Sequence, residues 1–423
     1  MDILVLVIMP ILLLVSGVPI FVVLLAASLG GVALSGNPLH SVHTAIFGSL
    51  DSFPLLAVPL FIYAGDIMAR GGIARRLIEL ILSVVGGVRG SLAVATIAAS
   101  AAFGVMSGSS IACVAAIGKL TIPAMRKNYG DRFSTSLVTA TGVIDVIIPP
   151  SIPMIIYGVV AQQSVTKLFL AGFVPGILIA LALSIYVVCY AHIKKIPITA
   201  PGQWPIILAT LKDAVWGLLA PVVILGGIYG GIFTPTEAAG VACIYAIIIS
   251  KFVYRELSWA DLWRMSTESA ALIAQILIIV SAAGAFAWLI TTSGFPGRLV
   301  ALVDSVGLET WVLLLVINML LLIVGSVLEP PAAILILTPL LTPIVYLAGV
   351  DPIHFGIIVT VNLAIGMFMP PFGLNLFASH ALFGTPLPTL YRGVLPFFLI
   401  YLAVLMLLTY VPAITLLPLQ LLY

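Results

Sequence analysis

Charged residues are scarce in this chain. Only 8% of its 423 residues are Asp, Glu, Lys or Arg, whereas a soluble globular protein carries about 25%. The 17 basic residues exceed the 15 acidic residues by two, so no strongly basic surface for nucleic acid is expected. With so little charge to cover a water-facing surface, a soluble enzyme is excluded.

The clusters that mark metal sites and catalytic centres are also missing. Cys113, Cys189 and Cys243 lie far apart without a CxxC pair, and the five histidines form no HExxH motif. We interpret the three cysteines as buried free thiols. No acid–base pair and no nucleophile with a base stands out. The sequence therefore predicts no catalytic residues, no enzyme activity and no cofactor.

Apolar residues are abundant: 62% of the chain is hydrophobic and the mean hydropathy is +1.29. Runs longer than 18 apolar residues predict membrane-spanning helices. The run 3–34 is too long for a signal peptide and lacks a basic start, so we expect one retained span, followed by a loop at 36–54. Further apolar segments are expected at 55–68, 168–192, 214–232, 238–252 and 270–293.

Two basic stretches flank an apolar segment at 91–125 and should both be cytoplasmic. The first contains an amphipathic helix at 73–85, which we place in the membrane interface. The two arms of the segment are too short for full spans and meet at a Ser-rich tip, which predicts a re-entrant hairpin. Pro149-Pro150 then interrupts the next apolar run, and a helix break at 149–153 is expected there.

The second half of the chain repeats the first at an offset of 220 to 222 residues. A second hairpin is predicted at 309–347 and a second helix break at 370–373. No Lys or Arg lies between Arg298 and Arg392, so the second hairpin should enter from the outer side. Inverted repeats with broken helices are typical of secondary transporters. We therefore predict an all-α polytopic membrane protein with two inverted repeats.

This organisation divides the chain into five parts. They are a first span and outer loop (1–54), repeat 1 (55–165), linking spans (166–269), repeat 2 (270–385) and a C-terminal span (386–423).

Hairpin tips and helix breaks that meet near mid-membrane supply hydroxyls and free carbonyls, the oxygen donors that a small cation prefers, and helix N-termini that favour an anion. Taken singly, Ser-Gly-Ser-Ser is equally typical of close helix packing, and Pro-Pro of a plain kink. Glu329 at the second tip has no basic residue within thirty positions and is expected to be functional. Asp145 either contributes to the site or caps the broken helix. Asp66 and Glu79 are expected in ion pairs, and Glu237 at a helix start.

Several motifs resemble those of the large membrane subunit of tripartite ATP-independent periplasmic (TRAP) transporters. They are Gly104 to Ala112 (GVMSGSSIA), Ile148 to Ser151, the Thr-Pro-Thr-Glu turn at 234–237, Leu328 to Ala332 and Met369 to Gly373. The resemblance covers essentially the whole chain. It implies an elevator-type symporter of the bacterial cytoplasmic (inner) membrane that uses a sodium gradient to import an organic acid. A C4-dicarboxylate, sialic acid or another sugar acid would be typical cargo.

The resemblance also implies two partners, a periplasmic substrate-binding protein and a small four-helix membrane subunit supplied as a separate chain. By position, it implies two sodium sites and a substrate site between them. The sodium ligands would come from Ser107, Gly108, Ser109, Ser110, Thr141, Gly142, Pro149 and Pro150 in repeat 1, and from Gly325, Ser326, Asn362, Gly366, Pro370, Pro371 and Gly373 in repeat 2. The substrate would border Ser109, Ser151, Glu329 and Asn375.

Two alternatives remain open at this stage. A stand-alone sodium-coupled dicarboxylate symporter with a related fold would need no binding protein. A channel or a membrane scaffold would show no gradient-driven accumulation.

Overall fold

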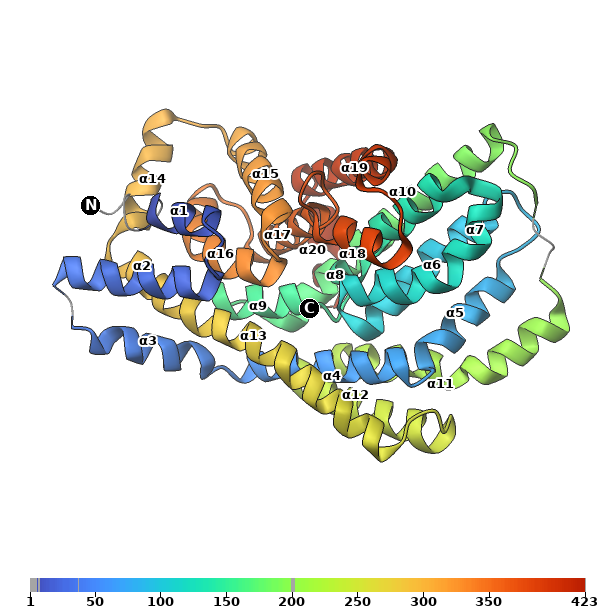
Figure 1. Ribbon diagram of the computed structural model, residues 1–423. Helices are drawn as coiled ribbons and strands as arrows, with labels where there is room; N and C mark the ends of the chain where they lie inside the picture. The colour runs from blue at the N-terminus through green and yellow to red at the C-terminus, as the bar shows by residue number, and fades with distance from the viewer. Residues whose placement is uncertain (1–5, 7, 37, 199–201, 423) are drawn as a thin grey trace.

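The computed structural model describes residues 6, 8–36, 38–198 and 202–422, and this part of the chain is built from helices without strands (Figure 1). Eight of the described helices are long and apolar enough to cross a membrane. The predicted all-α, multi-pass membrane fold is therefore confirmed.

The N-terminal region differs from the prediction of one span and a loop. Its helices are α1 (Met9–Val15), α2 (Ile20–Ser35), α3 (His40–Leu50) and the 3-10 helix η2 (Phe53–Leu56). The run 3–34 is divided because Gly17 adopts a left-handed backbone with φ of 80° and Pro19 then precedes α2. The segment 36–54 is largely helical instead of a loop. Residues 1–5, 7 and 37 lie outside the described residues.

Repeat 1 contains the predicted hairpin and broken helix. Its helices are α4 (Ala57–Arg70), α5 (Ile73–Val84), α6 (Ser91–Ser107), α7 (Ser110–Thr141), α8 (Ile144–Ile147) and α9 (Ile152–Val160). Gly130 has φ of 78° and ψ of 163°, so it divides α7 into the second hairpin arm and the following helix. The axis bends by 42° between the helix Ser110–Ile147 and α9, where the two prolines interrupt the helix.

In the described part of the chain, three helices and one π-helical turn connect the repeats: α10 (Val165–Ile193), α11 (Trp204–Tyr229), α12 (Pro235–Ile248) and η3 (Ile249–Val253). The next helix, α13 (Trp259–Thr292), leads into repeat 2. α11 and α13 begin earlier than the predicted residues 214 and 270. Each helix includes polar residues before its apolar run, and these residues were left out when apolar length was used to predict the spans. In α13 a capping box between Ser258 and Asp261 determines the true start.

Repeat 2 has the same plan, and a C-terminal region follows it. The helices are α14 (Phe295–Val306), α15 (Thr310–Val327), α16 (Pro330–Leu347), α17 (Pro352–Gly366), α18 (Leu374–Phe383), α19 (Leu387–Tyr410) and α20 (Ala413–Leu422). One C-terminal span was predicted at 386–423; α19 is long and apolar enough to cross a membrane, and the chain breaks at Val411 and Pro412 before the shorter α20.

Contacts at the two ends of α4 and α13 show that the repeats are inverted. α4 follows Phe53, whose carbonyl accepts a 3.1 Å hydrogen bond from Thr236, and ends at Arg70, which pairs with Glu268 near the start of α13. α13 then runs back, so that Gly284 packs against Ser49 near the start of α4. The hairpin that follows α13 therefore enters from the opposite end to the hairpin that follows α4.

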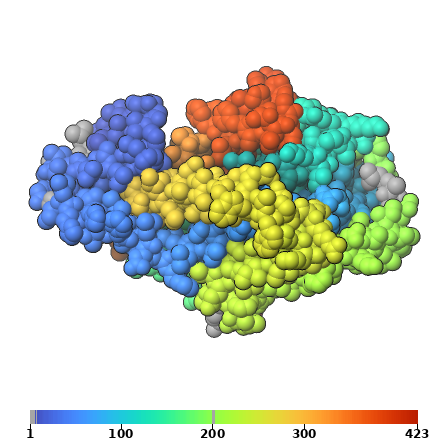
Figure 2. Space-filling model, turned by 60° about the horizontal axis from the view of Figure 1, so that its bottom comes forward, coloured from blue at the N-terminus to red at the C-terminus, as the bar shows by residue number. Residues whose placement is uncertain are grey.

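The two hairpins lie on opposite sides of the broken helices. In Figure 1, α6 and α7 lie on the right, α15 and α16 on the left, and α8, α9 and α17 between them; α6 contacts α8, and α16 contacts α9. Figure 2 shows α13 crossing a different face of the molecule, between the N-terminal helices and α11–α12. The helices α4, α11, α12 and α13 thus form one layer beside the hairpins.

Candidate functional site

The tip of the first hairpin touches the first helix break. Gly108, with φ of 62°, turns the chain between α6 and α7, and the N–H of Ser109 donates to Ser107 Oγ at 3.3 Å. A Cβ added to Gly108 would lie 3.6 Å from the carbonyl oxygen of Pro150. The tip and the break that the sequence expected to meet are thus neighbours, and Ser109 is exposed at the tip.

At the break, Ser151 forms the N-cap of α9. Its hydroxyl donates to the carbonyl of Val146 and accepts a 3.4 Å hydrogen bond from the N–H of Met154. Ser151 is fully buried, as are Pro149 and Pro150. This predicted substrate contact is therefore engaged inside the protein and holds the start of α9 in place.

Asn375 of the second repeat lies inside the first repeat's site. Its Nδ2 donates to Ser110 Oγ at 2.7 Å and to the carbonyl of Thr139 at 3.3 Å. A Cβ on Gly142 would lie 3.4 Å from the same nitrogen and 3.2 Å from the carbonyl oxygen of Ser110. Asn375 is fully buried and its Oδ1 has no hydrogen-bond partner among the described residues. The structure thus joins Ser110, Gly142 and Asn375.

The second site is built on close backbone contact. A Cβ on Gly366 would overlap the backbone of Gly325, and one on Gly325 would lie 3.0 Å from the Cα of Leu363. At the second break, a Cβ on Gly373 would lie 2.7 Å from the carbonyl oxygen of Met367. Side chains are excluded here, so the backbones of α15 and α17 pack directly against each other next to the second break.

Polar side chains at the second tip differ in exposure. Ser326 is buried and donates to the carbonyl of Ile323 at 2.7 Å. Glu329 precedes α16 without capping it through its side chain, and it is exposed. Pro370 is partly buried and Pro371 is exposed. Ser109 and Glu329 are therefore the predicted substrate contacts that an incoming solute can reach.

Asn362 binds to the neighbouring hairpin arm α15 through its side-chain amide. Its Nδ2 donates to Asn318 Oδ1 at 2.8 Å, and Asn318 donates in turn to Thr409 at 3.0 Å. His354 joins this buried cluster, with Nε2 3.3 Å from the carbonyl oxygen of Thr409 and Nδ1 2.7 Å from Thr415 Oγ1. The Oδ1 of Asn362 has no partner among the described residues, so this oxygen remains available as a ligand. Sequence reasoning missed the cluster; the available signal was Asn318 in the apolar middle of α15.

A second missed feature is a row of hydroxyls between α7 and the segment from α18 to Thr385. Thr385 donates to Asp131 at 2.8 Å and lies 3.0 Å from Thr135, and Thr139 donates to Ser379 at 2.7 Å. Asp131, Thr135 and Thr139 recur every four residues, which places them on one face of α7. This spacing was the available signal. The row leads to Asn375 and ties the two repeats together.

Thr141 and Asp145 lie where α7 ends. Thr141 accepts a 3.1 Å hydrogen bond from Ser100 of the first hairpin. Asp145 is fully buried, and neither carboxylate oxygen has a hydrogen-bond partner among the described residues. The alternative role as a helix cap is therefore not realised through a hydrogen bond.

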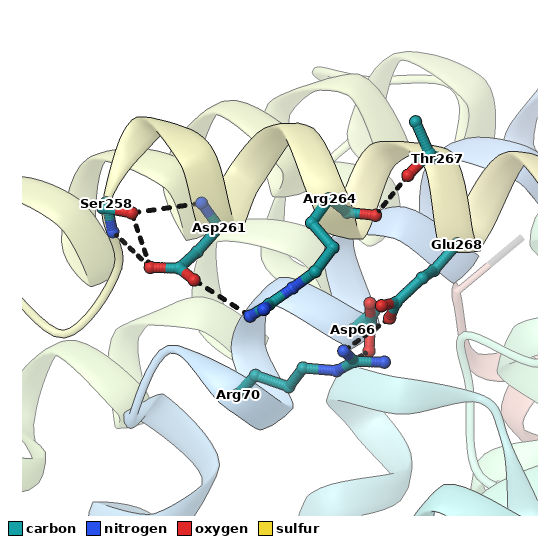
Figure 3. Close-up of polar contacts among 7 residues, drawn as sticks. All are labelled: Asp66, Arg70, Ser258, Asp261, Arg264, Thr267 and Glu268. Atoms are coloured by element: carbon teal, nitrogen blue, oxygen red, sulfur yellow. Dashed lines mark hydrogen bonds and ion pairs between the residues drawn. The ribbon is translucent and has the colours of Figure 1, made fainter.

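Ion pairs join the first part of repeat 1 to the linking spans, as Figure 3 shows for Arg70. Arg70 contacts Asp66 at 2.7 Å and Glu268 at 2.6 Å. Glu256 pairs with Arg75 at 2.7 Å and Arg76 at 2.6 Å. Burial acts to raise the pKa of Glu256, but hydrogen bonds from Arg76 and Arg75 outweigh it and hold the pKa below its usual 4.5.

The structure also tests the predictions for the acidic residues outside the site and for the three cysteines. The expected pairing of Asp66 is confirmed, and Glu79 lies 3.7 Å from Arg75. Glu237 forms a capping box with Thr234 at the start of α12. Cys113 and Cys243 are buried free thiols, but Cys189 is exposed because it lies on an outer face of α10.

Within the described residues, no group of three or more His, Cys, Asp or Glu side chains is arranged to hold a metal ion. The available donors are instead hydroxyls, amide oxygens, backbone carbonyls and single carboxylates. Such oxygen donors suit a hard cation such as sodium and not zinc.

Comparison with known proteins gives a consistent result over nearly the whole chain. The profile of the family described as "Tripartite ATP-independent periplasmic transporter, DctM component" matches residues 6–414. The C4-dicarboxylate TRAP transporter large permease protein DctM of Pseudomonas aeruginosa is 42% identical over 396 residues, covering 93% of this chain and 92% of that protein.

A longer relative is the isethionate TRAP transporter permease protein DctMQ of Oleidesulfovibrio alaskensis. It is 44% identical over 412 residues, which cover 95% of this chain and 64% of that protein. Among solved structures, the YdaH transporter of Alcanivorax borkumensis has a TM-score of 0.62 with 14% identity, covering 89% of each chain. That likeness concerns the fold alone.

Proposed function

The chain belongs to the DctM component family of TRAP transporters, and on this premise we propose that it imports a small organic acid anion in symport with sodium. In this proposal it is the large permease of the bacterial inner membrane. The substrate is delivered by a periplasmic binding protein, and a separate small membrane subunit completes the complex. Relatives named for a C4-dicarboxylate and for isethionate both take small organic anions, which supports this substrate class.

The observation that carries the proposal is the pairing of each hairpin with a helix break. Gly108 lies against Pro150 in repeat 1, and Gly325 lies against Gly366 in repeat 2. Broken helices within a membrane protein expose carbonyls and amide N–H groups, which are tolerated where they line a cavity and bind ions or substrate. Two such pairs in opposite orientation offer two related cation sites.

Substrate binding follows from the helix ends beside these sites. α7 begins at Ser110 directly after the first tip, and α16 begins at Pro330 directly after the second. The N-terminus of a helix carries a partial positive charge, which favours a carboxylate. Free N–H groups add to this at the start of α7, whereas α16 begins with two prolines that lack an N–H. Bound sodium adds positive charge, so we expect sodium to bind first and the anion to follow. Ser109 and Glu329, exposed at the two tips, would contact the polar groups of the substrate.

The transport movement would carry both sites together. Hydrogen bonds between α7 and the segment of α18 and Thr385 connect the repeats at several points, so the two hairpins and the broken helices form one unit. The layer that contains α4, α11, α12 and α13 would remain stationary with the small subunit. An elevator movement of the first unit past this layer would expose the sites alternately to the two sides of the membrane.

Uptake into proteoliposomes tests the proposal. The chain is reconstituted with its small subunit, and radiolabelled succinate is supplied outside with the binding protein, with or without an inward sodium gradient. Accumulation that requires both sodium and the binding protein is expected. Accumulation with sodium alone would favour a stand-alone symporter, whereas accumulation driven only by a proton gradient would overturn sodium coupling.

Two variants refine the test. Ser109→Ala and Glu329→Gln are expected to reduce uptake without changing the amount of folded protein. Glu309→Gln, at the start of α15 and exposed, serves as the matched control for Glu329→Gln. Equal loss in both glutamate variants would contradict a specific role for Glu329.

A further inference from the structure

The two repeats are not chemically equivalent at one matched position. Residues 325 and 366 of repeat 2 correspond to residues 104 and 145 of repeat 1 at an offset of 221, the same offset that aligns Pro370 with Pro149. In repeat 2 both positions are glycine. In repeat 1 the pair is Gly104 and Asp145, so a carboxylate occupies the place of Gly366.

The structure keeps this correspondence in space. Just as a side chain on Gly366 would overlap Gly325, a Cβ on Gly104 would lie 2.8 Å from the Cα of Asp145 and 3.2 Å from its Oδ1. In both repeats a hairpin arm therefore approaches the broken helix at the same point. Because Gly366 belongs to the second proposed sodium site, Asp145 lies at the first.

No positively charged side chain among the described residues is paired with Asp145. It is 0% exposed, and neither of its oxygens has a hydrogen-bond partner in the described part of the chain. The N–H groups of Gly108 and Ser109 at the hairpin tip face the carboxylate without completing a hydrogen bond. A buried carboxylate in this situation requires a bound cation or some other compensation.

We propose that Asp145 is a direct ligand of the sodium ion at the first site, so that this site, unlike its partner in repeat 2, binds the cation through a negative charge. The inference rests on the proposed sodium coupling and extends it. The carboxylate would act with neutral oxygens of the neighbouring tip and break, where Ser109, Thr141 and Pro150 lie. The first site should then bind sodium more tightly than the second, because a full negative charge attracts the ion more strongly than carbonyl dipoles do.

Sodium-dependent stability of the purified full chain in lipid nanodiscs provides the test. The thermal unfolding midpoint is measured against sodium chloride, with choline chloride keeping the ionic strength constant, for the wild type, Asp145→Asn and Asp145→Gly. Asparagine retains the shape and an oxygen acceptor but not the charge, and glycine reproduces the residue of repeat 2. Direct binding of radioactive sodium at equilibrium gives a second readout that does not depend on transport.

Both variants are expected to need at least about tenfold more sodium for half-maximal stabilisation, the lower end of what loss of a group supporting a metal site causes. In choline alone, Asp145→Asn should unfold at a temperature no lower than the wild type, because an uncompensated buried charge has been removed. Asp131→Asn is the control, since this carboxylate already pairs with Arg126 at 2.6 Å. It should leave the sodium dependence unchanged.

Two different results would contradict the inference, and they can be told apart from each other. If the variants keep the wild-type sodium dependence, or if they are merely less stable in every salt, Asp145 has a structural role and the inference is wrong while sodium coupling stands. If the wild type itself responds no more to sodium than to choline, both the inference and the proposed sodium coupling fail.

Discussion

Asn375 Nδ2 lies 2.7 Å from Ser110 Oγ, although the two residues are 265 positions apart in the chain. The bond joins the first turn of α18, which follows the break of repeat 2, to the first turn of α7, which follows the hairpin tip of repeat 1. One amide therefore connects the two repeats at the point where the proposed ion and substrate sites meet.

Replacing Asn375 should accordingly impair both stability and transport. Asn375→Ala leaves the carbonyl of Thr139 and the hydroxyl of Ser110 without this buried partner, which costs about 1–3 kcal/mol. We expect a lower unfolding midpoint and a large loss of uptake. Asn128→Ala, the same substitution at an exposed position of α7, should change neither. Wild-type uptake by Asn375→Ala would show that the contact does not matter for transport.

The hydrogen bond between Thr139 and Ser379 should couple the two helices energetically. In a double-mutant cycle with Thr139→Val and Ser379→Ala, measured by denaturant unfolding, the interaction energy is expected to be about 1 kcal/mol. The physical reason is that both hydroxyls are fully buried, so neither finds water when the other is removed. Strictly additive effects would contradict the coupling.

Close packing at the second site predicts sensitivity to a single methyl group. Gly366→Ala places a Cβ into the backbone of Gly325, which cannot move as a flexible side chain would, and should destabilise the protein by about 1–3 kcal/mol. Gly240→Ala is the matched control, because it lies within helix α12 with nothing near its Cβ. That change should be neutral or stabilise by up to about 1 kcal/mol. Thermal unfolding in detergent compares the two, and equal stability would contradict the packing argument.

The ion pairs of Glu256 predict a pH dependence of stability. Since the pKa of Glu256 is lower in the folded protein than its usual 4.5, its contribution is fully present above pH 4.5 and is lost as the pH falls through the folded-state pKa. Glu256→Gln should therefore be less stable than the wild type at neutral pH, by about 1 kcal/mol or less.

The difference should disappear in acid, which unfolding midpoints measured from pH 7 down to pH 3 would reveal. Glu79→Gln removes an exposed carboxylate whose contact with Arg75 is longer, at 3.7 Å, so its effect should be smaller at every pH. A Glu256→Gln difference that grows towards low pH would contradict the sign of this prediction.

Local chemistry explains what could be predicted from the sequence. Pro149-Pro150 and Pro370-Pro371 must interrupt helices because proline lacks an N–H, and the structure breaks at both places. The hairpin tip at Gly108 could be predicted because a serine-rich turn lies between two apolar segments that are too short to span the membrane. The start of α13 was missed, because apolar length was used as the criterion while the capping box at Ser258 lies among polar residues.

Long-range contacts could not be predicted in the same way. Asp66 has a partner four residues away in Arg70, and helical spacing was enough to expect the pair. Glu268 shares that arginine from a distance of 198 residues, and Glu256 reaches Arg75 and Arg76 across a similar distance. No local rule indicates these partners.

By itself, the sequence determined the class of protein, the two repeats and the places where helices break, because hydropathy, charge bias and proline act through nearby residues or through composition. Only the tertiary structure decided that Asn375 lies in the site of the other repeat, that Asn362 bonds to Asn318, and that Asp145 is buried against Gly104 with no hydrogen-bond partner among the described residues. These relationships depend on how helices pack across the two repeats, and packing is determined by all the contacting surfaces together.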